Sequence, residues 1–183
     1  MKHIGMGIFL FGLIGCGDGK IATIEFSESS QAEVPGGGPL GALFSELGFD
    51  GFMDMSISES EELANQGVAP GDISSAEITS FTLSVLDPEG EDLSFINSLE
   101  IWVETEGIDP VMVASQTAFP EGSSSVEFNL EKVDIVAFVV SEKMTITTEV
   151  DGGLPAEDTT LEAVVDFAVG VTIQGALNAS SKE

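Results

Sequence analysis

Apolar and polar residues alternate along most of the chain after residue 20, a pattern typical of half-buried β-strands. In the longest such run, over 161–173, every second residue is apolar while Glu162 and Asp166 occupy the opposite face. β-Branched and aromatic residues, which favour a pleated surface, are frequent in these runs. The alternation predicts a first strand from about residue 20 and further strands near 78–86, 98–104, 111–117, 124–130, 143–150 and 160–173.

Turn-forming residues separate these runs, as at Asp87-Pro88-Glu89-Gly90 and Asp151-Gly152-Gly153. Short strands without alternating helices predict an all-β fold, which we interpret as an antiparallel immunoglobulin-like β-sandwich. We expect one short helix over 58–66, which Gly67 would end. A segment rich in proline, glycine and serine over 27–41 is predicted to be a loop.

The N-terminal residues have the composition of a secretory signal. Lys2 precedes mostly apolar residues 4–14, and small Gly15 comes directly before Cys16. This apolar stretch is too short to cross a bilayer, which takes about 20 residues. We therefore expect a cleaved signal peptide over 1–15.

The sequence Leu13-Ile14-Gly15-Cys16 resembles the lipobox of bacterial lipoproteins. The resemblance implies cleavage after Gly15, transfer of a diacylglycerol to the Cys16 thiol and acylation of the new amine. It divides the chain into a signal peptide (1–15), a lipidated cysteine with a short tether (16–19) and a single domain (20–183). Gly17 after the lipidated cysteine is compatible with delivery to the outer membrane in this family.

The chain is strongly acidic, with 32 Asp and Glu residues against five lysines and a formal net charge of −27. Such a surface repels phosphate backbones, so a nucleic-acid partner is excluded. It also repels anionic lipid headgroups, so membrane attachment would come from acyl chains. The acidity has two interpretations: a solvated coat, which a saline habitat would favour, or a surface that binds divalent cations.

Cleavage of the signal would remove His3, the only histidine, and lipidation would occupy Cys16, the only cysteine. Triads of the Ser-His-Asp or Cys-His kind and zinc sites built from His and Cys are then impossible. Two carboxylates can hydrolyse a glycoside, but with 32 acidic residues their spacing carries little information. The sequence therefore predicts a protein that is not an enzyme and requires no cofactor, with a glycosidase as an alternative.

A calcium site is a further hypothesis, because successive connections in a sandwich alternate between its two ends. Connections 87–97, 118–123 and 151–159 would then share one end. Ca²⁺ binds carboxylate and carbonyl oxygens, although no loop has the Asp-x-Asp-x-Asp-Gly spacing of a dedicated calcium loop. The candidate ligands are Asp87, Glu89, Asp92, Asp151 and Asp158.

Trp102 is the other candidate for binding. Side chains alternate between the two faces of a strand, so Trp102 shares a face with Glu100 and Glu104, which is the polar side. A solvent-facing tryptophan can stack on a sugar or anchor a protein partner, and the alternative is a ring covered by a neighbouring loop.

The sequence predicts a lipid-anchored lipoprotein of the bacterial envelope, at the outer membrane, that acts as a structural or partner-binding module. A calcium- or glycan-binding module is the alternative.

Overall fold

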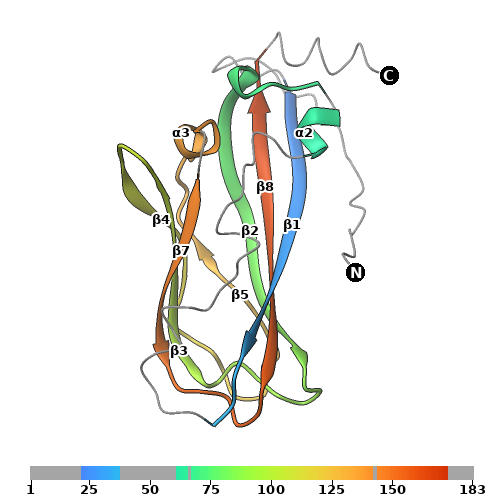
Figure 1. The fold of residues 1–183 in the computed structure, drawn as a ribbon, viewed down its shortest axis with the longest axis vertical. Helices are drawn as coiled ribbons and strands as arrows, with labels where there is room; N and C mark the ends of the chain where they lie inside the picture. Colours follow the sequence, from blue (N-terminus) through green and yellow to red (C-terminus); the bar gives the residue numbers. More distant parts are fainter. Residues whose placement is uncertain (1–21, 38–60, 66, 142–143, 173–183) are drawn as a thin grey trace.

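The computed structural model describes residues 22–37, 61–65, 67–141 and 144–172. These residues form eight strands in two four-stranded antiparallel sheets that face each other (Figure 1). Sheet A has the order β1 (Ala22–Val34), β8 (Thr159–Val171), β2 (Ile73–Asp87) and β5 (Ser125–Glu127). Sheet B has the order β6 (Asn129–Leu130), β4 (Ile108–Gln116), β3 (Ile96–Thr105) and β7 (Thr145–Gly152).

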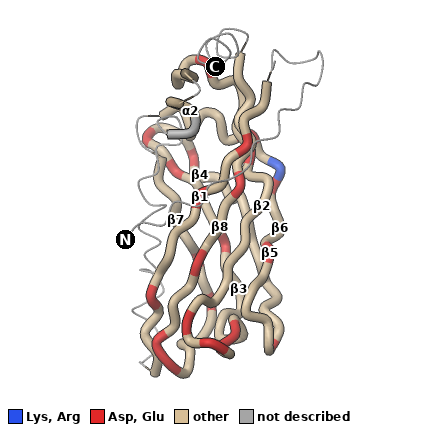
Figure 2. The backbone as a smooth tube through the Cα atoms, turned by 90° about the vertical axis from the view of Figure 1, so that its right-hand side faces the viewer, with Lys and Arg blue, Asp and Glu red and all other residues tan. Residues whose placement is uncertain are grey.

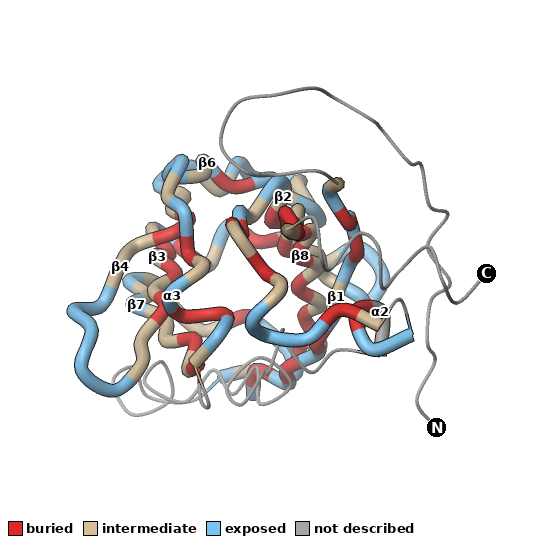
Figure 3. Tube along the Cα trace, turned by 90° about the horizontal axis from the view of Figure 1, so that it is seen from above, coloured by how far each residue is buried: buried red, intermediate tan, exposed pale blue. Residues whose placement is uncertain are grey.

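The all-β prediction is confirmed, and each predicted strand overlaps an observed one, although the strand predicted over 124–130 corresponds to both β5 and β6. Alternation accounts for the agreement, since Leu161, Ala163 and Val165 of β8 are buried while the residues between them are partly exposed. The apolar sides of both sheets contribute to one hydrophobic core, to which sheet A supplies Leu83 and sheet B supplies Leu99. Figure 3 shows the buried stretches on the strands of both sheets.

The predicted loop over 27–41 is wrong for its first eight residues, which belong to β1. This strand pairs with β8 along its whole length, from Ala22 opposite Val171 to Val34 opposite Thr159. Glu28 and Ser30 take inward-facing positions in β1 and interrupt the apolar pattern that would have revealed the strand. The strand forms because β8 supplies a complete row of backbone partners. Residues 38–41 lie outside the described part of the chain.

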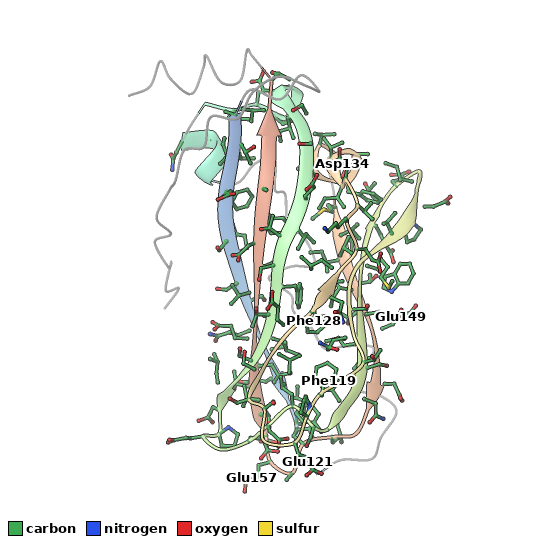
Figure 4. The ribbon with its side chains drawn as sticks, turned by 180° about the vertical axis from the view of Figure 1, so that it is seen from behind. Phe119, Glu121, Phe128, Asp134, Glu149 and Glu157 are labelled. Carbon is green, nitrogen blue, oxygen red and sulfur yellow. The ribbon has the colours of Figure 1, made fainter. Side chains whose placement is uncertain are left out.

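Segment 125–135 passes from one sheet to the other, so the predicted strand over 124–130 is divided in two. β5 pairs with β2 in sheet A, and β6 pairs with β4 in sheet B. Between them the Phe128 N–H donates to the Phe81 carbonyl at 2.9 Å. The Phe128 ring enters the space between the sheets, 4.8 Å from the Phe81 ring (Figure 4).

The same segment then returns to sheet A through Asp134 and Ile135. The Ile135 N–H donates to the carbonyl of Ala76 in β2 at 2.8 Å. The Asp134 Oδ1 atom accepts the Ala76 N–H at 3.0 Å and the Val136 N–H at 3.0 Å. A side-chain oxygen thus replaces the backbone carbonyl that a neighbouring strand would offer to Ala76. The segment ties the two sheets together along one side of the domain.

Helices are short in the described residues. Helix α2 (Glu61–Asn65) lies inside the predicted helix over 58–66, of which 58–60 and 66 are outside the described part. A 3₁₀ turn, η3 (Pro70–Asp72), and a single helical turn, α3 (Val136–Val139), were not predicted. The apolar, partly β-branched sequence of α3 has no helical period, and its Phe138 and Val139 are buried. No described helix has both the length and the apolar character needed to cross a membrane.

Candidate functional site

The connections that follow β2, β4 and β7 meet at one end of the domain, as predicted (Figure 1). The Leu93 N–H donates to the Ser123 carbonyl at 3.0 Å, and the Gly153 N–H donates to the Phe95 carbonyl at 2.6 Å. Acidic residues gather at this end (Figure 2), with Glu121 and Glu157 among them (Figure 4). We call this end, formed by residues 88–95, 117–124 and 153–158, the loop rim.

Asp92 joins two connections of the loop rim. Its Oδ1 atom accepts the Ser94 N–H at 2.9 Å, and its Oδ2 atom accepts the Gly122 N–H at 2.5 Å. The Ser94 hydroxyl, followed by the N–H groups of Gly122 and Ser94, lowers the pKa of Asp92 below its ordinary value. A general acid for glycoside hydrolysis needs the opposite shift. The structure gives this predicted ligand a role in holding the loops in place.

Two other predicted ligands also make structural contacts. The Asp158 Oδ1 atom accepts the Gly36 N–H at 2.9 Å, which fixes the chain after β1 to the loop before β8. The Asp151 Oδ2 atom accepts an N–H of the Asn97 side chain at 3.3 Å. The two carboxylates bind separate donors, Asp158 one on the chain after β1 and Asp151 one on β3.

The remaining two predicted ligands are Asp87 and Glu89. Asp87 ends β2 and lies opposite Thr160 of β8, while Glu89 is an exposed residue of the turn that follows. Within the described ranges, no group of three or more His, Cys, Asp or Glu side chains is arranged to hold a metal ion. The shared end of the domain is confirmed, but the structure does not bring the five predicted calcium ligands together as one set.

Trp102 lies on the outer face of sheet B, as its parity predicted. Its neighbours Ile101 and Val103 are buried, whereas Trp102 is half-buried. On this face Trp102 lies opposite Met112 of β4 on one side and Thr147 of β7 on the other. The face therefore presents an indole ring supported by adjacent strands.

Three carboxylates share the outer face of sheet B with Trp102, namely Glu100 and Glu104 on β3 and Glu149 on β7. The Trp102 Nε1–H donates to the Glu100 Oε2 atom at 3.3 Å, and the Thr147 hydroxyl donates to the Glu104 Oε1 atom at 2.9 Å. Glu149 of β7 lies directly opposite Glu100 and on the outer side of sheet B (Figure 4). The part played by Glu149 was missed from the sequence, because it depends on the register between β3 and β7. We call Trp102, Met112, Glu100, Glu104 and Glu149 the tryptophan face.

The lipidation site cannot be placed in the fold. Gly15 and Cys16, with the signal peptide over 1–15 and the tether over 16–19, lie outside the described residues. Lipidation therefore stays a prediction from the sequence. The chain matches no protein-family model, and no curated protein matches its sequence.

Proposed function

We propose that this chain is a lipid-anchored module of the bacterial envelope that binds a protein partner without catalysing a reaction. The observation that carries the proposal is Leu13-Ile14-Gly15-Cys16 after a short apolar stretch, which resembles a lipobox. Gly17 after the cysteine supports outer-membrane delivery. The tryptophan face supports binding, because a partly exposed tryptophan is a frequent anchor in protein interfaces.

The domain would present these surfaces on a rigid β-sandwich. Two facing antiparallel sheets with one shared core support that architecture. In an immunoglobulin constant domain the last strand belongs to the second sheet, whereas here β8 lies between β1 and β2. We therefore propose an immunoglobulin-like sandwich in architecture, with a strand order of its own.

Mass spectrometry of the protein from a membrane fraction tests the anchor. We expect a mature chain that begins at Cys16 and carries a diacylglycerol and an N-acyl group. Cys16→Ser should stay unprocessed and lose the lipid, while Ser29→Ala, an exposed change in β1, should leave processing intact. An intact N-terminus or an unmodified thiol in the wild-type protein would contradict the proposal.

Crosslinking in intact cells tests partner binding. We expect the lipidated protein to be captured with one reproducible envelope protein, and the same protein should be absent when cells that lack this chain are treated in the same way. If crosslinkers of several lengths capture no protein reproducibly, the result would contradict the proposal of a binding module.

An alternative proposal places a Ca²⁺ site at the loop rim, and the observation that favours it is the convergence of acidic connections there. A ligand that binds only the native state raises its stability, by about 2.7 kcal/mol at a hundredfold excess over Kd. The melting temperature should then rise with calcium in the wild type and less in Asp158→Asn. The change Glu25→Gln in β1 removes the same charge away from the rim and serves as control. A melting temperature independent of calcium would remove this alternative.

A further inference from the structure

The tryptophan face combines an indole ring with opposed carboxylates. Glu100 and Glu149 are direct cross-strand partners, and like charges in this position destabilise a sheet. Lys132 is the single basic residue among those described, and it follows β6 at the edge of sheet B farthest from β7. The described part of the chain thus has one positive charge, at Lys132, against the three carboxylates of this face.

We infer that the tryptophan face docks a basic, extended segment of a partner protein, with an arginine side chain over Trp102. This inference rests on the proposed binding function and names the chemistry of the partner. A guanidinium group stacks on an indole face and also forms paired hydrogen bonds with a carboxylate. Glu100 and Glu149 would supply the carboxylates beside the ring.

The spacing along β3 fits an extended partner. Glu100, Trp102 and Glu104 occupy alternate positions on one face of the strand, so their Cα atoms are about 7 Å apart. Alternate residues of an extended peptide have the same spacing. A segment with basic residues at every second position would therefore place one cation on Trp102 and another beside Glu104.

Charge complementarity selects this occupant over a second copy of the chain. The chain contains five lysines and no arginine against 32 acidic residues, so two copies repel each other. Anionic lipid surfaces are repelled for the same reason. A basic partner segment gains from every carboxylate on the face, and the charges would also speed its association.

The purified full-length protein in neutral detergent can be tested with a fluorescent eight-residue peptide of alternating arginine and serine. Trp102 is the only tryptophan of the chain, so its emission reports on this face alone. We expect saturable binding by anisotropy, a matching change in tryptophan emission, and affinity that falls as salt increases. A peptide with citrulline in place of arginine keeps the shape without the charge and should bind at least tenfold more weakly.

Variants locate the binding. Trp102→Leu should weaken peptide affinity about tenfold or more, as truncation of an interface anchor does. The double variant Glu100→Gln/Glu149→Gln should weaken it several-fold. The control Glu25→Gln/Glu33→Gln removes the same charge from exposed positions of β1 and should stay within twofold of wild type. Trp102→Phe, which keeps an aromatic ring, should fall between wild type and Trp102→Leu, and circular dichroism checks that each variant is folded.

Several results would overturn the inference. The first is that the arginine peptide does not bind saturably. The second is that the citrulline peptide binds as tightly as the arginine peptide. The third is that the β1 control and the Glu100/Glu149 variant lose the same amount of peptide affinity. Binding of neutral glycans on an array, lost in Trp102→Leu but kept in the charge variant, would identify the face as a glycan surface instead. If crosslinking captures an envelope partner equally well with Glu100→Gln/Glu149→Gln, the binding function stands and this location fails.

Discussion

The contact of Asp134 with β2 yields a sharp test of how the two sheets are joined. One side-chain oxygen accepts the N–H groups of Ala76 and Val136, each at 3.0 Å. Ala76 is fully buried, so its N–H would have no ready water partner after Asp134→Ala. Asp134→Asn keeps an oxygen in the same position and is the matched control.

The expected cost follows from the two hydrogen bonds. An unsatisfied buried N–H costs about 1–3 kcal/mol, and loss of a side-chain acceptor at the start of a helical turn costs about 0.5–2 kcal/mol. Asp134→Ala should therefore lower the free energy of unfolding by about 1.5–5 kcal/mol. The Asn variant should lose less than about 1 kcal/mol, because a neutral acceptor is weaker than a charged one but still satisfies both donors.

Urea unfolding followed by far-UV circular dichroism and Trp102 emission measures both variants. With an m-value of about 2 kcal/mol/M, the Ala variant should unfold at a midpoint about 0.8–2.5 M lower than wild type. A loss of less than about 0.5 kcal/mol in Asp134→Ala would refute the reasoning. Equal losses in the Ala and Asn variants would refute it as well, since the role of the oxygen would then be irrelevant.

Three further changes test the core, a close backbone contact and the loop rim. Phe167→Ala, at a fully buried position of β8, should cost about 3–5 kcal/mol in urea unfolding, whereas Val164→Ala on the outer face of the same strand should cost about 1 kcal/mol or less. Gly152→Ala would place a Cβ 2.5 Å from a backbone carbonyl oxygen and should cost about 1–3 kcal/mol, while Gly71→Ala, with open space around it, should stay within about 1 kcal/mol of wild type. Because the folded state lowers the pKa of Asp92, its contribution is present above the ordinary carboxyl pKa and is lost as the pH falls through the folded value. The melting-temperature difference between wild type and Asp92→Asn should thus be constant near neutral pH and shrink in acid, and a difference that grows on acidification would contradict the assignment.

Alternation predicted most of the strand positions because each sheet has one face in the core and one in solvent. Leu99, Ile101 and Val103 could be assigned to the buried side, and Trp102 to the outer side, from parity alone. The convergence of three connections at one end also followed, since antiparallel strands reverse direction at each turn. These features depend on local sequence and on simple geometry.

Pairing between distant segments could not be read from the sequence. Residues 27–34 form a strand because β8 pairs with them, although their own composition favours a loop. The division of 124–130 between two sheets depends on contacts with β2 and β4. Likewise, Glu149 joins Glu100 beside Trp102 only through the register of β7 on β3. The sequence alone therefore placed Trp102 with Glu100 and Glu104, but it did not reveal that Glu149 lies on the same face.

The antiparallel pairing of β1 with β8 has a mechanical consequence. Ala22 begins β1 beside the last residue of β8, at the end of the domain opposite the loop rim. A pull between a tether attached before Ala22 and a load held at the rim acts along the strand axis. All thirteen residue pairs between the two strands then resist in shear at the same time, instead of peeling apart one after another.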